Sequence, residues 1–130
     1  MSWRNTLESD GPLSAERFTR IITALLRDET TTLDEAVKSV RADCRLAAIT
    51  LGARGSIVVT PDDVVEVPAI GVSHVVDTTG AGDLYAAGFL FAHTRGDALA
   101  DCARIGAIAA AEVIGHVGPR PLVELRTLLR

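Results

Sequence analysis

A chain of 130 residues with 48% hydrophobic content is long enough for one globular domain with a substantial core. Its net charge of -4, from 13 basic and 17 acidic residues scattered along the chain, offers no basic stripe for a nucleic-acid backbone. No apolar run reaches the roughly 20 residues that span a bilayer, and the polar N-terminus lacks the apolar core of a signal peptide. We therefore expect a cytoplasmic protein that binds neither nucleic acid nor membrane, with an unassigned leader over 1–13 and one domain over 14–130.

Two helices are predicted before the first clear strand. The apolar residues over 14–27 follow the i, i+3, i+4 spacing of one helical face, which predicts an amphipathic helix. Thr32 with Glu35 three residues later has the form of a capping box. A second helix is therefore expected to start there and to end near Ala42.

Three short strands are predicted next. Residues 46–51 form an apolar run that suits a strand buried on both faces of a sheet. Turn residues separate this run from 56–60, and another turn leads to 64–67, so a hairpin or meander follows. The sheet should have an antiparallel portion. Residues 74–76 are also strand-like and lead into the segment 77–83.

The C-terminal half is predicted to be helical. Residues 84–94 and 97–114 are rich in Ala and Gly and almost free of charge in the middle, which indicates buried helices. Small side chains let backbones approach closely, and either tight packing or an adjacent flat ligand would use that. Gly118 and Pro119 should stop the second helix, and a last one is expected to begin at Pro121.

The segment Asp77-Thr-Thr-Gly-Ala-Gly-Asp83 concentrates the chemistry of the chain. Glycines that enter a helix leave backbone N–H groups unobstructed at the positive end of its dipole, which predicts an anion site. No Gly-Lys-Ser/Thr follows, and Tyr85 replaces the third glycine of the dinucleotide fingerprint, so two familiar phosphate motifs are excluded. The carboxylate of Asp83 would repel phosphate, yet it suits a base that accepts a hydroxyl proton during phosphoryl transfer. From spacing alone, a plain helix cap explains Asp83 equally well.

The full string from 77 to 83, followed by Tyr85-Ala-Ala-Gly-Phe89, closely resembles the second signature of the ribokinase-like (PfkB) sugar and nucleoside kinases. Upstream, Ile49-Thr-Leu-Gly-Ala-Arg-Gly55 resembles the nucleotide-binding strand and turn of that family. Downstream, the segment 109–118 resembles the helix and loop that close over the adenine. The resemblance implies an α/β fold: the C-terminal portion of a ribokinase-like (Rossmann-like) three-layer sandwich, with a mixed sheet flanked by helices.

The resemblance also implies an ATP-dependent kinase with assigned residues. Asp83 would be the catalytic base, while Gly80, Ala81 and Gly82, with the N–H of Asp83, would form the anion hole. Mg²⁺ would arrive with ATP and bridge its phosphates. The residues expected to bind the nucleotide are Thr50, Gly52, Gly55, Ala107, Ala110, His116 and Gly118.

Asp77 and Thr79 are the expected ligands of a potassium-like cation beside the anion hole, again by resemblance. The alternative is that Asp77 only braces the turn through hydrogen bonds. The Asn-x-x-Glu element of the family, expected near Asp28 to Ala36, has no Asn in this chain. The family's magnesium arrangement is therefore unmatched here.

The resemblance places most acceptor-binding residues and the lid in an N-terminal half that this sequence does not match. The acceptor is expected to be a sugar or nucleoside, and adenosine-type nucleosides are favoured because the ending Ala111 to Pro121 resembles that of bacterial adenosine and sugar kinases. A strand at 46–51 without its neighbours would leave an open sheet edge, which predicts a homo-oligomer or pairing with the missing half. The alternative function is a catalytically silent nucleotide-binding remnant that self-associates or pairs with another chain.

Overall fold

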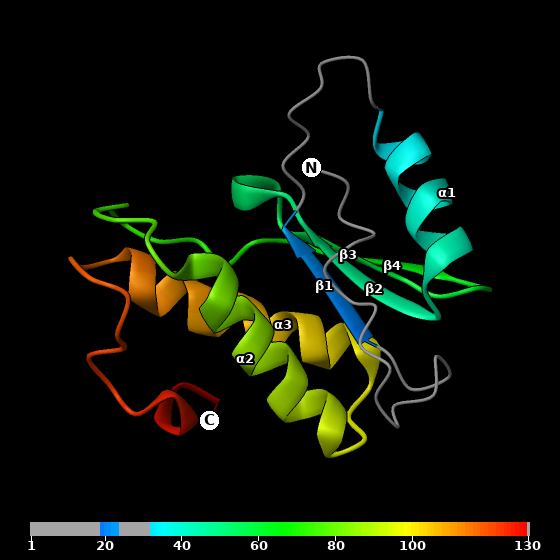
Figure 1. Ribbon diagram of the computed structural model, residues 1–130. Coiled ribbons are helices and arrows are strands. Elements are labelled where there is room, and N and C mark those ends of the chain that lie inside the picture. Colours follow the sequence, from blue (N-terminus) through cyan, green and yellow to red (C-terminus); the bar gives the residue numbers. More distant parts are fainter. Residues whose placement is uncertain (1–18, 24–31, 130) are drawn as a thin grey trace, which may run out of the picture.

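The computed structural model describes residues 19–23 and 32–129, which form a sheet between two layers of helices (Figure 1). In chain order the elements are β1 (Thr19–Thr23), α1 (Leu33–Asp43), β2 (Leu46–Thr50), the 3₁₀ helix η3 (Gly52–Arg54), β3 (Ser56–Val59), β4 (Val64–Val67), α2 (Ala81–Thr94), α3 (Leu99–Ile114) and the 3₁₀ helix η4 (Leu125–Leu129). Helix α1 covers one face of the sheet, while α2 and α3 cover the other. This is the expected mixed sheet flanked by helices.

The sheet has the strand order β1-β2-β3-β4. Strands β1 and β2 are parallel, and the pairs β2–β3 and β3–β4 are antiparallel. The antiparallel portion was expected, but the open edge at residues 46–51 was not found. Strand β2 is paired on both sides because Thr19–Thr23 supplies a parallel neighbour, with Ile21 opposite Ala48.

The predicted helix over 14–27 is wrong at residues 19–23, where the chain forms β1. Four of these five residues, Thr19, Ile21, Ile22 and Thr23, are β-branched and therefore suit a strand. The apolar spacing of so short a run does not distinguish a helix from a buried strand. Pairing with β2 decides between them. The rest of the predicted helix, the leader over 1–13 and residues 28–31 lie outside the described residues.

The core is divided between the two faces of the sheet. Because successive strand residues point to opposite faces, Ala48 and Val58 pack with Phe89 on the α2/α3 side. Ile49 is buried on the other side, where it packs with Val40 of α1. Both faces of the central strands are apolar, as expected for a sheet covered on both sides.

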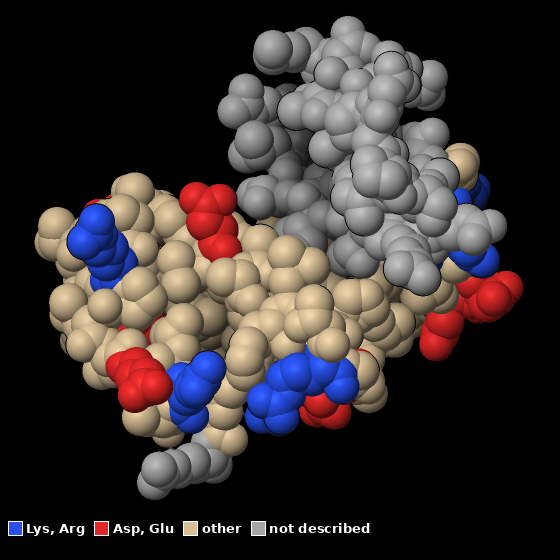
Figure 2. All heavy atoms as spheres, turned by 60° about the horizontal axis from the view of Figure 1, so that its bottom comes forward, with Lys and Arg blue, Asp and Glu red and all other residues tan. Residues whose placement is uncertain are grey.

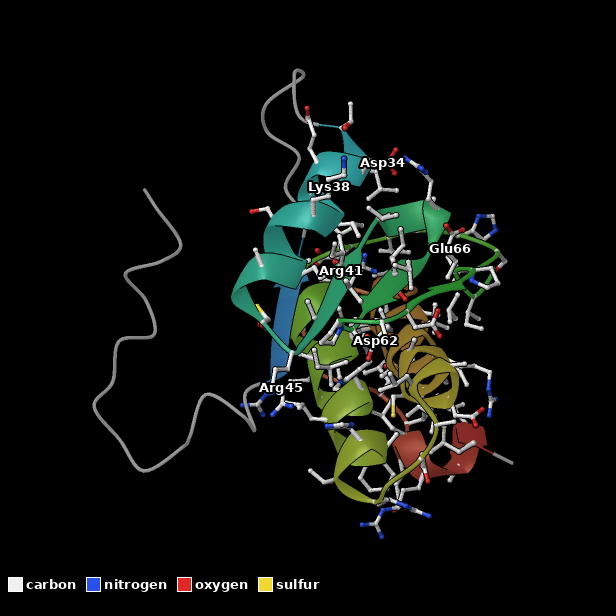
Figure 3. All side chains as sticks on the ribbon, turned by 90° about the vertical axis from the view of Figure 1, so that its right-hand side faces the viewer. Asp34, Lys38, Arg41, Arg45, Asp62 and Glu66 are labelled. Atoms are coloured by element: carbon white, nitrogen blue, oxygen red, sulfur yellow. The ribbon has the colours of Figure 1, made fainter. Side chains whose placement is uncertain are left out.

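Helix α1 begins and ends close to its predicted bounds. The capping box is confirmed, since the Thr32 hydroxyl accepts from Glu35 N at 3.3 Å and the Glu35 carboxylate accepts from Thr32 N at 2.9 Å. Near its end, Arg41 Nε donates to Thr60 O at 3.0 Å, which ties α1 to the turn between β3 and β4. Figure 3 shows Arg41 between α1 and this turn, which also carries Asp62.

Helices α2 and α3 approach so closely that backbone meets backbone at two glycines. A methyl group built on Gly88 would lie 2.9 Å from Ile105 O, and one on Gly106 would lie 2.8 Å from Tyr85 O. This confirms the close approach expected from the small residues of both helices.

The remaining differences from the expected elements concern short segments. Residues 74–76 are not a strand: Val76 N donates instead to Ile114 O, at 2.8 Å, at the end of α3. After Pro121 only the short helix η4 forms. Within the described residues no helix is both long and apolar enough to cross a membrane. The face in Figure 2 carries separate charges of both signs.

Candidate functional site

A cleft of about 810 Å³ lies between the sheet and the first turns of α2. Three parts of the chain form it: the end of β2 with η3, the segment after β4, and the facing sides of α2 and α3. The lining residues are Thr50, Leu51, Gly52, Ala53, Arg54, Gly55, Ser56, Ala69, Ile70, Gly71, Val72, Val75, Thr78, Ala81, Gly82, Tyr85, Ala107, Ala110, Ala111 and Ile114. Most of these side chains are small or apolar, and the polar ones are those of Thr50, Arg54, Ser56, Thr78 and Tyr85.

The turn before α2 presents backbone donors to this cleft. Gly80 has φ of 80°, in the left-handed region, and occupies the N-cap position. The N–H of Ala81 donates to Thr78 O at 3.2 Å, and that of Leu84 to Gly80 O at 2.9 Å. The N–H groups of Gly82 and Asp83 have no acceptor among the described residues, as expected in the first turn of a helix. They are therefore available to an anion.

Asp83 lies in the first turn of α2, which begins three residues before the predicted start at Leu84. Because Gly80 is the N-cap, the alternative that Asp83 caps the helix is wrong. A carboxylate in the first turn still interacts favourably with the positive end of the helix dipole. Asp83 is exposed and does not line the cleft, but it follows directly after Gly82, which does.

The turn at η3 forms another part of the cleft lining. Gly55 has φ of 96°, and a methyl group on it would collide with Val67 O of β4. Leu51 N donates to Gly55 O at 2.8 Å, which closes the turn. Only glycine satisfies both the backbone angle and the contact at position 55. The family resemblance of the sequence assigns this turn to nucleotide binding.

Tyr85 of α2 and Ser56 of β3 join the helical side of the cleft to the sheet, and pattern reasoning did not find this pair. The Tyr85 hydroxyl donates to Ser56 Oγ at 2.8 Å, and both residues are buried. Burial raises the pKa of Tyr85 above its ordinary 10.0, and the bond to Ser56 opposes that rise. The only signal in the sequence is a serine at the start of an otherwise apolar strand.

Asp77 braces the signature turn. Its Oδ1 accepts from Thr79 Oγ1 at 2.6 Å and from Thr79 N at 2.9 Å, and its Oδ2 accepts from Gly118 N at 3.0 Å. The Thr79 hydroxyl, followed by the Gly118 N–H, lowers the pKa of Asp77 from 3.8 to about 2. Asp77 thus joins the turn to the loop after α3.

The predicted site residues fall into two groups. The structure brings Thr50, Gly52, Gly55, Ala107 and Ala110 together around the cleft, along with Ala81 and Gly82. His116 and Gly118 do not line it. They lie in the loop after α3, where Gly118 contacts Asp77 and His116 lies 3.2 Å from Glu112.

Glu112 is a further residue that the sequence reasoning missed. It is the only charged residue between Ile105 and Ile114, and such isolation in an apolar helix is the signal that could have found it.

Within the described residues no group of three His, Cys, Asp or Glu side chains is arranged to hold a metal ion.

Residues 18–125 match the family model of the pfkB family carbohydrate kinases. Over 70 residues the chain is 46% identical to a nucleoside kinase of Methanocaldococcus jannaschii, a match that covers 54% of this chain and 23% of that protein. An adenosine kinase from Sinorhizobium meliloti aligns with a TM-score of 0.75 and 52% identity, covering 78% of this chain and 31% of the other. Arabidopsis thaliana ribokinase, complexed with ribose and ATP, aligns with a TM-score of 0.68 and 27% identity. That alignment covers 77% of this chain and 34% of the ribokinase chain.

These structural neighbours confirm the ribokinase-like fold, and this chain accounts for only part of it. It spans about a third or less of the length of each of the three proteins. The family model, in contrast, covers most of this chain, including the cleft and the signature turn. The chain therefore belongs to the pfkB family of carbohydrate kinases.

Proposed function

We propose that the chain is the ATP-binding and catalytic part of a kinase that transfers the γ-phosphoryl group of ATP to a hydroxyl of a sugar or nucleoside. The observation that carries this proposal is the cleft between η3 and α2. Thr50 and Ala107, assigned to the nucleotide by resemblance, line the same cavity as Gly82 of the proposed anion hole.

The chemistry of the cleft fits ATP. Ala107, Ala110 and Ala111 form a wall of small side chains on α3, which suits a flat base. At the start of α2, the N–H groups of Gly82 and Asp83 suit phosphate oxygens. The volume of about 810 Å³ is within the usual range for a small-molecule site.

Asp83 would act as the base because it is exposed and adjacent to those donors. Its carboxylate would accept the proton of the acceptor hydroxyl as that oxygen bonds to phosphorus and the bond to the leaving ADP oxygen breaks. The N–H groups at the start of α2 would hold the negative charge of the transferring group. ATP would supply the phosphoryl group, and the Mg²⁺ bound to it would neutralise charge on the phosphates.

A potassium-like cation beside Asp77 and Thr79 is a lesser part of the proposal. Three hydrogen bonds to Asp77 leave about one of its four lone-pair positions for a cation. Carbonyl oxygens of the loop after α3 would have to complete the shell. Tighter ATP binding in potassium chloride than in choline chloride, at equal ionic strength, would support this site.

For the acceptor we propose a sugar or nucleoside, with an adenosine-type nucleoside favoured. The proteins that this chain resembles are described as nucleoside kinase, adenosine kinase and ribokinase, so the class is shared while the individual acceptor differs. A second copy or an N-terminal half is the proposed partner. Exposed apolar side chains at Val75, Val76, Val117 and Leu122 favour such a partner, and sedimentation of a clean monomer would contradict self-association.

The proposal is tested by calorimetric titration of the purified chain with ATP and Mg²⁺, followed by assays of ADP release with ribose, fructose and adenosine. Asp83→Asn should retain ATP binding and lose about 10²-fold to 10⁴-fold in ADP release, because only the base is removed. Asp101→Asn, an exposed carboxylate on α3, is the matched control and should behave like the unsubstituted chain.

A second pair of variants tests the location of the nucleotide. Ala107→Leu should weaken ATP binding at least about tenfold by filling the cleft, whereas Ala100→Leu, exposed on the same helix, should not. ATP binding without ADP release would favour the silent remnant. No ATP binding at all would exclude both nucleotide functions for this chain.

A further inference from the structure

Glu112 is a carboxylate held inside the end of α3. Its side chain is only 10% exposed. Oε1 accepts from Leu122 N at 2.9 Å and lies 3.2 Å from His116 Nε2, while Oε2 is buried and has no hydrogen-bond partner among the described residues. Burial of a carboxylate with one oxygen unpaired costs free energy, and an apolar residue of similar volume would often be more stable at such a position. Stability alone therefore does not explain Glu112.

The loop that Glu112 holds is in contact with the signature turn. His116 stands near the beginning of this loop and Leu122 at its end, so one carboxylate oxygen fixes both. Between these two points, Gly118 N donates to Asp77 Oδ2 at 3.0 Å. Pro119 fills the space beside Gly80, where a methyl group would lie 2.7 Å from its Cβ.

We propose that Glu112 is a positioning residue for the signature turn: it closes the 116–122 loop so that Gly118 and Pro119 remain seated on Asp77 and Gly80. The contacts form a continuous chain: Glu112 contacts the loop, and the loop contacts the turn that leads into Ala81 and Gly82. The consequence for nucleotide binding rests on the function proposed above. The positioning itself rests only on the contacts.

The test compares backbone amide exchange by NMR in the unsubstituted chain, Glu112→Ala and Glu112→Gln. In the Ala variant the amides of Leu122, Gly118 and Thr79 should exchange at least about tenfold faster, relative to amides in the middle of α3. Thr79 is the decisive amide because it donates to Asp77 and does not contact Glu112. The Gln variant keeps an acceptor oxygen at the Oε1 position and should restore protection to within about threefold.

Val113→Ala is the control for a general loss of stability. Val113 is fully buried next to Glu112 and takes no part in the loop contacts. Its truncation should raise exchange throughout α3 without singling out Gly118 and Thr79. ATP affinity, measured in parallel, should fall about tenfold in Glu112→Ala and recover in Glu112→Gln.

Two results would overturn the proposal. One is faster exchange at Leu122 alone, with Gly118 and Thr79 unchanged, which would make Glu112 a local tie. The other is an exchange pattern in Glu112→Ala that matches Val113→Ala, or that Glu112→Gln does not rescue. If the unsubstituted chain binds no ATP, the proposed function fails, while the exchange pattern still decides whether Glu112 positions the turn.

Discussion

Two regions beside the cleft are built in opposite ways. At the η3 turn and along the α2–α3 contact, backbones meet because side chains are absent, at Gly55, Gly88 and Gly106. At the signature turn, hydrogen bonds hold the backbone in place: Asp77 accepts two from Thr79 and one from Gly118. The first region depends on the absence of side chains at close contacts, and the second depends on the negative charge of Asp77. They should therefore fail under different perturbations.

The largest effect is expected where space and backbone angle act together. Gly55→Ala should lower the free energy of unfolding by about 3 kcal/mol, because a methyl group there collides with Val67 O and the residue has φ of 96°. Gly52→Ala is the matched control, since Gly52 also has a positive φ of 59° but no atom within 4 Å of the added group. It should lose only about 1 kcal/mol. Urea titration measures both, and equal losses would show that the contact is unimportant.

The second-largest loss of stability is expected at the contact between α2 and α3. Gly106→Ala places a methyl group 2.8 Å from Tyr85 O, a backbone atom that cannot move alone, so the helices must separate. We expect a loss of about 1–3 kcal/mol in the free energy of unfolding. Gly71→Ala adds the same group where no atom lies within 4 Å and should change stability by less than about 0.5 kcal/mol. A Gly106→Ala variant as stable as Gly71→Ala would contradict backbone-to-backbone packing.

The same division explains what the sequence could predict. The glycine-rich segments were recognisable because a missing side chain is visible in the sequence itself, and Gly55, Gly80 and the small residues of α2 and α3 lie in the expected turn and contact. The capping box at Thr32 was equally local. Each of these features could be recognised from residue types within one short segment, even where the contact that uses them joins two segments, as between Gly106 and Tyr85.

Contacts between distant segments were not recognisable. The strand at Thr19–Thr23 exists because β2, more than twenty residues later, pairs with it, and local apolar spacing favoured a helix instead. The pair Tyr85 and Ser56 and the bond from Gly118 to Asp77 depend in the same way on tertiary placement. Local pattern therefore predicted the motif and its turn, but not the polar contacts that hold it.

Tyr85 sharpens the comparison because it places a polar contact inside the packed region. Tyr85→Phe should cost about 1–2 kcal/mol of unfolding free energy, since it leaves the buried Ser56 hydroxyl without its donor. Adding Ser56→Ala should recover part of that loss by removing the unpaired group. Thermal or urea unfolding of the two single variants and the double variant gives the coupling. Strictly additive losses would mean that the hydrogen bond contributes nothing of its own.

The smallest effect is expected from the charge at the signature turn, and it should appear only in acid. The pKa of Asp77 is lowered to about 2 in the folded chain, against 3.8 for an ordinary Asp, so the unfolded chain binds the proton first as pH falls. The contribution of Asp77 to stability is therefore complete above about pH 4 and is lost as the pH falls toward 2. Asp77→Asn should show a flatter decline of unfolding free energy across this window, measured by urea titration at successive pH values. Thr79→Val, which removes the hydroxyl donor, should raise the pKa of Asp77 and narrow the window. If the unfolding free energy of all three proteins declined identically in acid, the turn would be held by packing, as the η3 turn and the α2–α3 contact are.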